Sequence, residues 1–203
     1  MRLQRAGRAT CGPLNADVRQ QIRHLAVIMI RPAKSSDAAS LAVIAERTFR
    51  ETFAIDNTEE NIDLHCARKF SVEIQGEELS DPQLTTLLAE VAGELVGFAQ
   101  LRLAPATACV KGDRPAELHR IYVSSQWHGR GVANELMRAI YATAAKAASD
   151  CIWLGVWERN LKAIAFYLKC GFSVVGDHPF VLGRDRQRDL ILAAQLDSLS
   201  SVA

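Results

Sequence analysis

The stretch LHRIYVSSQWHGRGVANELMRAIY, residues 118–141, decides the fold of this chain. It begins as an apolar strand and continues through Gly129 and Gly131 into an amphipathic helix. Glycine has no Cβ, so the chain can turn sharply here and a ligand can approach the backbone closely. The apolar residues after the turn recur at helical spacing: Val132, Leu136, Ala139, Ile140 and Ala144. Because the first N–H groups of a helix lack internal partners and the helix dipole is positive there, the segment predicts an anion-binding site.

The glycine pair alone is not specific, since an ordinary strand-to-helix connection can also contain G-x-G. Two nucleotide-binding classes are nevertheless excluded. No G-x-G-x-x-G follows the strand, which excludes the dinucleotide-binding fingerprint. No Gly-Lys-Ser/Thr ends the turn, which excludes a P-loop. The ligand must therefore be a different anion.

A second motif lies downstream of the turn. Residues 151–156, CIWLGV, predict a buried strand, and a helix is expected from Asn160 to Cys170. Gly171 is its expected left-handed stop, and a strand is expected over residues 172–175. The order is therefore strand, helix, strand.

Together, the two motifs resemble the GNAT superfamily of N-acetyltransferases. Its members carry an Arg/Gln-x-x-Gly-x-Gly/Ala turn that wraps the coenzyme A pyrophosphate, followed by an Asn-x-x-Ala-x-x-Phe-Tyr-x-Lys-x-Gly-Phe helix. Residues 160–172, NLKAIAFYLKCGF, match the second motif at every defining position. The first motif is HGRGVA, residues 128–133, with His128 where the family usually has Arg or Gln. That departure leaves the backbone amides in place and affects one side-chain contact.

The resemblance covers roughly residues 29–196 and extends to a subfamily. Four segments are similar to the PaiA-type spermidine/spermine acetyltransferases: residues 152–158, 163–167, 176–183 and 189–191. The family fold is α/β (α+β): a central mixed, mostly antiparallel twisted sheet with helices on both faces and a splayed central strand pair. We therefore expect a single GNAT acetyltransferase domain over residues 28–203.

Residues 1–27 are expected to lie outside this domain. They are rich in arginine and show no sustained hydrophobic period, so we expect a disordered or non-native extension. A native start at Met29 is the preferred hypothesis. The apolar run 25–30 is too short to span a membrane and precedes Arg31 and Pro32, so neither a signal peptide nor a membrane helix is expected.

The remaining elements follow from periodicity and capping residues. A strand over residues 27–31 should lead to Ser35 or Ser36 as the N-cap of a helix. Asn57, with Glu60 three residues later, predicts the cap of a second helix, and Ser71 opens a third. Residues 85–91 and 95–103 predict a hairpin, and 105–115 a loop. A last hairpin pairs 172–175 with 189–196 through a connection over 176–187.

The resemblance also implies the residues that bind acetyl-CoA, the expected co-substrate. They are Ile121, Tyr122, Val123, His128, Gly129, Arg130, Gly131, Val132, Ala133, Asn160 and Tyr167. Backbone groups of Ile121 and Val123 are expected to meet the pantetheine amides. Arg130 could pair with a coenzyme phosphate or be an ordinary exposed loop arginine. Asn160 could bind the pantetheine arm, serve as an N-cap, or do both.

Amine acetylation requires two proton transfers, and the sequence offers candidates for each. An alkylamine has a pKa of about 10.4 and must lose a proton before it attacks a thioester. Glu117 is the first candidate base, and His119, on the same strand face, is the second. Each could instead be a structural residue. Tyr167 occupies the family position of the general acid that protonates the departing thiolate, although it could simply pack against its neighbours.

Composition limits the partners. The chain has 203 residues, 49% hydrophobic content and a net charge of +1, so neither nucleic acid nor an anionic membrane is expected as a partner. The cysteines are odd in number and include no C-x-x-C pair: Cys11, Cys66, Cys109, Cys151 and Cys170. We therefore expect no disulfide framework and no metal site, and a cytoplasmic location.

The sequence is compatible with more than one class of acceptor. The subfamily likeness implies a polyamine or similar small amine, and a group of acids before the sheet could attract it: Glu46, Glu51, Asp56, Glu59 and Glu60. Thr52 and Phe53 could equally line a pocket for a protein N-terminus or an amino acid. A protein or peptide N-terminal or lysine acetyltransferase is the alternative, and a non-catalytic acetyl-CoA-binding regulatory module is the alternative of another class. A homodimer also stays open.

Overall fold

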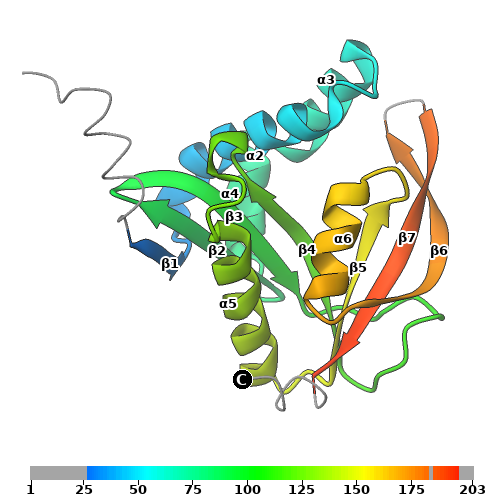
Figure 1. Cartoon of the computed structure of the whole chain (residues 1–203). Coiled ribbons are helices and arrows are strands. Elements are labelled where there is room, and N and C mark those ends of the chain that lie inside the picture. Colours follow the sequence, from blue (N-terminus) through cyan, green and yellow to red (C-terminus); the bar gives the residue numbers. More distant parts are fainter. Residues whose placement is uncertain (1–26, 183–184, 197–203) are drawn as a thin grey trace, which may run out of the picture.

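The computed structural model describes residues 27–182 and 185–196, in which seven strands form one sheet of order β1-β2-β3-β4-β5-β7-β6. The strands are β1 (Ile28–Pro32), β2 (Leu84–Val91), β3 (Glu94–Arg102), β4 (Pro115–Val123), β5 (Cys151–Trp157), β6 (Ser173–Leu182) and β7 (Asp185–Gln195). Only β4 and β5 are parallel; every other neighbouring pair is antiparallel. The predicted mixed, mostly antiparallel sheet is confirmed (Figure 1).

Helices cover both faces of this sheet, as predicted (Figure 1). They are α2 (Ala38–Phe53), α3 (Glu59–Lys69), α4 (Val72–Ser80), α5 (Val132–Lys146) and α6 (Leu161–Lys169). The apolar stripes of α5 and α6 pack on one face, where Leu136 and Ile140 are fully buried. The stripe of α2 packs on the other face, where Leu41 and Phe49 meet Phe98 of β3. Each such buried side chain stabilises the fold by about 1.5–3 kcal/mol.

The two central strands separate along their length. Parallel pairing between β4 and β5 covers only Pro115–Glu117 and Cys151–Trp153, whereas β4 continues to Val123 and β5 to Trp157. Backbone N–H and C=O groups beyond the paired section therefore have no ladder partner on the inner side of the splay. Such groups must be paired by a ligand, a side chain or solvent. The expected splayed central pair is confirmed.

A β-bulge in β4 changes which side chains share a face. Consecutive residues of β3 pair with Arg120 and Leu118, so His119 is an extra residue. Leu118 and Ile121 consequently both pack on the α5 side. On the opposite side Arg120 reaches Glu78 of α4. The bulge therefore turns two neighbouring polar residues, His119 and Arg120, away from the α5 core.

Several local predictions hold. Ser71 caps α4, because its Oγ accepts a hydrogen bond from Ile74 N–H. Gly171, which follows α6, has a left-handed backbone with φ of 92°, as expected for a helix stop. The turn between β2 and β3 has positive φ at Ala92 and Gly93, as a tight hairpin requires. Residues 103–114 form the expected connection before β4.

Two predicted caps are displaced. A short 3-10 turn, Ser35–Asp37, precedes α2, and Lys34 N–H donates to the Asp37 carboxylate, so neither Ser35 nor Ser36 is the N-cap. The cap of α3 is Thr58 rather than Asn57. The Asn57 amide instead donates to the carbonyl of Phe53 at the end of α2. The Thr58 side chain accepts a hydrogen bond from Asn61 N–H, whereas the N-cap of α2, Asp37, makes no side-chain capping bond.

The predicted connection over residues 176–187 is wrong. Strand β6 continues to Leu182 and β7 begins at Asp185, with Leu182 and Asp185 paired. Pro179 has no N–H to donate, but β6 is the edge of the sheet, where a missing N–H is tolerated. A register shift beside Gly176 marks a bulge, which places that glycine within the strand.

The proposed extension, apart from Val27, lies outside the described residues, and Met29 is part of β1. Among the helices of the described part, none is long and apolar enough to cross a membrane.

Candidate active site

The glycine turn opens α5 as predicted. Gly129 and Gly131 have φ of 73° and 84°, and Gly131 is the N-cap of α5. No side chain caps this helix start. The N–H groups of Val132 and Ala133 therefore remain available for a ligand, at the positive end of the helix dipole. These glycines are required because a left-handed backbone is costly for residues with a Cβ.

His128 connects the turn to its surroundings. Its Nε2 donates to the carbonyl of Val123 at 2.8 Å, and its Nδ1 lies 2.8 Å from Nζ of Lys162, which donates to it. The ring thus fixes the end of β4 and brings a lysine from α6 to the turn. Lys162 was not predicted as a site residue, although it follows Asn160 within the helix motif. A cation at this position adds to the anion-attracting field of the helix start.

Arg130 points elsewhere. Its guanidinium stacks over the Trp127 ring, 5.3 Å from the centroid. Among the described residues that line the cavity at the turn, Arg130 is absent, whereas Gly129 and Gly131 are present. The structure therefore does not bring Arg130 together with the other expected coenzyme residues.

A single cavity of about 640 Å³ joins the turn to the helical side of the sheet. It passes through the splay between β4 and β5. Except for Arg130, all of the expected site residues line it: Glu117, Ile121, Tyr122, Val123, His128, Gly129, Gly131, Val132, Ala133, Asn160 and Tyr167. His119, the second candidate base, lines it as well. A volume of this size suits a small-molecule site.

Tyr167 lies in the wall of this cavity. Its side chain is 9% exposed and packs edge-on against Phe172. Burial raises the pKa of its phenol, with Tyr122 adding to the shift. The hydroxyl consequently stays protonated at neutral pH, as a proton donor must. The Asn160 side chain accepts a hydrogen bond from Ala163 N–H and so caps α6, which leaves its amide NH₂ group to serve a ligand.

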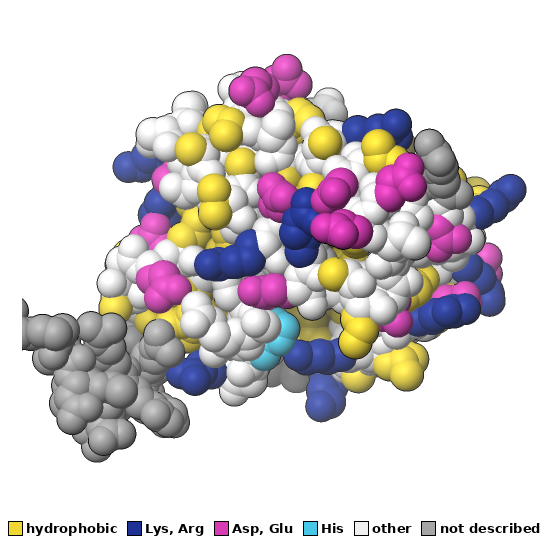
Figure 2. All heavy atoms as spheres, turned by 90° about the horizontal axis from the view of Figure 1, so that it is seen from above, with side chains coloured by type: hydrophobic (Ala, Val, Ile, Leu, Met, Phe, Trp, Pro, Cys, Tyr) yellow, Lys and Arg dark blue, Asp and Glu magenta, His cyan; other side chains and the backbone are white. Residues whose placement is uncertain are grey.

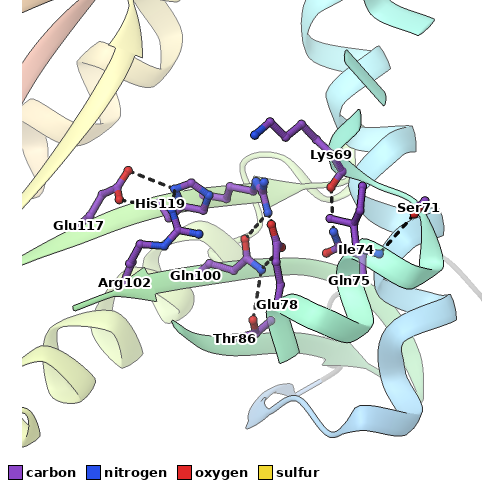
Figure 3. Close-up of polar contacts among 11 residues, drawn as sticks. Lys69, Ser71, Ile74, Gln75, Glu78, Thr86, Gln100, Arg102, Glu117 and His119 are labelled. Atoms are coloured by element: carbon purple, nitrogen blue, oxygen red, sulfur yellow. Dashed lines mark hydrogen bonds and ion pairs between the residues drawn. The ribbon is translucent and has the colours of Figure 1, made fainter. Parts of the chain in front are cut away.

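Glu117 and His119 form a hydrogen-bonded pair on the other wall. Oε1 of Glu117 lies 3.1 Å from Nδ1 of His119, and Arg102 approaches both side chains (Figure 3). Burial alone would raise the pKa of Glu117, but His119, Arg102 and Arg120 together lower it. Burial lowers the pKa of His119 despite its carboxylate partner. At neutral pH the pair therefore consists of a carboxylate and a neutral imidazole.

A buried ion pair, not predicted from the sequence, supports this wall. Arg120 donates to Glu78 at 2.6 Å and to Gln100 at 2.7 Å. The amide of Gln100 donates in turn to Glu78 and to Thr86 (Figure 3). This network joins α4 to three strands. The network pairs the Arg120 guanidinium, so this residue presents no unpaired positive charge to the cavity.

Aromatic rings enclose the far end of the cavity, which we call the acceptor lobe. Its lining includes Phe49, Phe53, His65, Phe70, Trp157 and Phe180. His65 stacks on Phe49 with ring centroids 4.3 Å apart, and burial lowers its pKa to about 4, so it is neutral. Thr52 and Phe53 both line the lobe, as the sequence suggested.

The acids expected to attract the acceptor lie outside this lobe. Glu46 pairs with Arg50 on the surface, and Glu51 accepts from Ser125 N–H. Figure 2 shows acidic and basic side chains interspersed on the face seen from above. Among the described residues, the acids that line the cavity are Glu117 and Asp189. No three side chains of the metal-ligating types lie together in that part of the chain.

Known proteins share this sequence and fold. Residues 41–172 match the Acetyltransferase (GNAT) family. An uncharacterised N-acetyltransferase of Mycobacterium tuberculosis is 34% identical over 162 residues, which are 79% of this chain and 99% of the relative. A spermine/spermidine N(1)-acetyltransferase of Bacillus subtilis is 29% identical over 89 residues, 43% of this chain and 59% of that protein.

Among solved structures, the PaiA N-acetyltransferase of Thermoplasma acidophilum, in complex with coenzyme A, has the same fold. Its TM-score is 0.68 at 24% identity, with 83% of this chain and 99% of that chain covered. The family match extends over both motifs and over most of the sheet. The chain therefore belongs to the acetyltransferase (GNAT) family and is an acetyl-CoA-dependent N-acetyltransferase.

Proposed function

We propose that the chain acetylates a small primary amine, such as a polyamine. The observation that carries the proposal is the single cavity that joins the glycine turn, the Glu117–His119 pair and an aromatic acceptor lobe. The lobe is enclosed by side chains of α2, α3, β5 and β6, which suits a small acceptor. The similarity to a spermine/spermidine acetyltransferase supports the polyamine class.

The turn and the splay are proposed to hold acetyl-CoA, which supplies the acetyl group as a thioester. Free N–H groups at the start of α5, with Lys162 beside His128, fit the pyrophosphate. Unpaired backbone of Ile121 to Val123 in the splay fits the amides of the pantetheine arm. Asn160 has an amide group to spare for the same arm. Arg130 contributes only if its side chain leaves the Trp127 ring.

The Glu117–His119 pair is proposed to take the proton of the acceptor amine. With Glu117 ionised, the tautomer with hydrogen on Nδ1 donates to the carboxylate at 3.1 Å, in place of accepting the longer 3.4 Å contact from Arg102, and leaves the Nε2 lone pair free. His119 can then accept a proton, directly or through water, while Glu117 stabilises the imidazolium. The fold thus combines the two candidate bases of the sequence in one unit.

Tyr167 is proposed to protonate the leaving group. As the amine nitrogen bonds to the acetyl carbon, the carbon–sulfur bond breaks and the sulfur takes the phenolic proton. Overall, one proton leaves the amine for the His119 side and one reaches the sulfur from Tyr167. A buried phenol that never ionises near neutral pH suits this role and is unnecessary for binding alone. This argues against a non-catalytic regulatory module.

Three finer expectations accompany this proposal. A protein N-terminus or lysine as acceptor is the alternative. The described cysteines are free, which supports a reducing compartment such as the cytoplasm. A homodimer stays a prediction from the sequence.

A mass-spectrometric screen tests the acceptor class. The chain is incubated with acetyl-CoA and polyamines, amino acids or N-terminal peptides, and reactions without acceptor give the background hydrolysis. We expect acetylated polyamines and background levels for peptides. Acetylated peptides with unmodified polyamines would overturn the proposed acceptor, and background levels throughout would overturn the activity on amines.

A further inference from the structure

Strands β5, β6 and β7 present a set of polar side chains to the acceptor lobe that the mechanism above does not use. Asp189 of β7 pairs with Trp157 of β5 and with His178 of β6, so all three share one face. Gly155, two residues before Trp157, shares this face and lines the same cavity. Different strands thus converge on one side of the lobe.

Gly155 leaves a space between the two polar side chains. A Cβ at this position would lie 3.4 Å from Nε2 of His178 and 3.6 Å from Oδ2 of Asp189. A ligand atom cannot occupy the Cβ position itself, which is one bond length from Cα, but without a side chain at Gly155 the cavity extends to both polar side chains. Oδ2 of Asp189 can accept a hydrogen bond there.

One oxygen of the Asp189 carboxylate, the buried Oδ1, has no hydrogen-bond partner among the described residues. Burial raises the pKa of this carboxyl, and the nearby His178 lowers it to a smaller extent. The other acid of the cavity, Glu117, is already paired with His119 and Arg102. An unpaired buried carboxylate costs free energy that a cationic ligand recovers.

The surroundings favour a cation over a neutral group. Trp157 stands beside Asp189 and packs against Phe53, with ring centroids 6.2 Å apart. Trp153, on the same face, lines the cavity too. Aromatic faces attract a positively charged nitrogen in a desolvated site. Lys69 and Arg120 also line the cavity, but Arg120 is neutralised by Glu78.

This site is too far from the proposed base to hold the reacting nitrogen. Glu117 is in register with Trp153, and Asp189 is in register with Trp157. His119, the proposed proton acceptor, lies two residues beyond Glu117 toward that same end, so the separation comes from the width of the sheet: β5 lies between β4 and β7, and two strand spacings are about 10 Å. A nitrogen that loses its proton to the Glu117–His119 pair therefore differs from one held by Asp189.

We propose that the space above Gly155 is a subsite, formed by Asp189 and His178, for a second positively charged nitrogen of the acceptor. This inference rests on the proposed acetyl transfer and deepens it. The acceptor class becomes an amine that carries a further ammonium group, and the carboxylate is the specificity-determining residue for it. A monoamine leaves the subsite empty.

Paired substrates test the subsite. Linear diamines of increasing length are compared with monoamines of equal carbon number, in the wild type, Asp189→Asn and Gly155→Ala. Loss of a charged hydrogen bond of 1.5–3 kcal/mol should lower kcat/KM for the best diamine by about 10- to 100-fold, mainly through KM. Gly155→Ala should act in the same direction by filling the space. In both variants kcat/KM should fall far less for monoamines than for diamines.

Asp177→Asn is the matched control. Asp177 neighbours His178 on β6 but pairs with Arg188 on the outside, so its replacement removes the same charge without touching the lobe. Equal loss for diamines and monoamines in Asp189→Asn, or no diamine preference in the wild type, would overturn the subsite while acetyl transfer stands. Equilibrium binding of the diamines, measured by calorimetry, gives a readout independent of turnover. Equal affinity in the wild type and Asp189→Asn would also contradict the subsite, even if no amine is acetylated.

Discussion

Oε1 of Glu117 lies 3.1 Å from Nδ1 of His119, where the β-bulge of β4 turns His119 toward the cavity. Neither residue is an independent base in this geometry. Neighbouring positive charges keep the Glu117 carboxylate ionised. Burial lowers the pKa of the His119 imidazole, and the nearby carboxylate offsets part of that decrease. Removing either charge near His119 must therefore move the pH dependence of the reaction.

Glu117→Gln should slow acetyl transfer and shift its acidic limb. The Glu117 carboxylate raises the pKa of His119, so its loss should move the limb, below the ordinary histidine pKa of about 6.5, to still lower pH. The rate at the plateau should fall by about 10- to 100-fold, because His119 remains as the base but loses a charged hydrogen bond that stabilises its imidazolium. Profiles of kcat/KM against pH measure both effects.

Arg102→Ala gives the opposite sign and serves as the control. Arg102 lowers the pKa of His119, so without it the acidic limb should move to higher pH. Limbs that stay in place in both variants would show that a group other than His119 takes the proton.

His128→Ala should weaken acetyl-CoA binding only modestly. The ring makes hydrogen bonds with the Val123 carbonyl and the Lys162 amine, whereas the proposed phosphate contacts come from the backbone of the turn. Loss of these hydrogen bonds should raise the Kd by about tenfold or less. Titration calorimetry with acetyl-CoA measures this Kd, and Lys162→Ala is measured in the same way for comparison. A loss of binding much greater than in Lys162→Ala would assign the side chain of His128 a direct contact.

Gly131→Ala should damage both stability and coenzyme binding. The φ of 84° is left-handed, which costs a residue with a Cβ about 1–2 kcal/mol. The Tm should fall by several degrees, and the Kd for acetyl-CoA should rise because the free N–H groups of α5 move. Gly76→Ala, in α4 with open space around it, should raise the Tm slightly instead. An unchanged Kd in Gly131→Ala would remove the turn from the coenzyme site.

Residues within contiguous motifs could be predicted from the sequence. The strand, turn and helix around Gly129 and Gly131, and the cap, phenol and stop around Asn160, Tyr167 and Gly171, all lie where expected. Each depends on neighbours within a few residues, so local backbone rules determine it. The resemblance to the family supplied the splay, which no local rule contains.

Residues brought together by strand register could not be predicted. Asp189, His178 and Gly155 meet only because β7 lies between β5 and β6. The assumption that residues 176–187 form a loop moved His178 out of the sheet altogether. Likewise, the bulge at His119 and the pairing of Arg120 with Glu78 depend on the alignment of β3 with β4 and on the docking of α4.

Comparison of Tyr167→Phe with the wild type, in kcat and in acetyl-CoA affinity, tests the proposed acetyl transfer most directly. Tyr141→Phe is the control, because its hydroxyl donates to the carbonyl of Cys170 away from the cavity. We predict that Tyr167→Phe lowers kcat by about 10²- to 10⁴-fold with the Kd for acetyl-CoA nearly unchanged, and that Tyr141→Phe keeps its turnover. Full turnover in Tyr167→Phe would contradict the account.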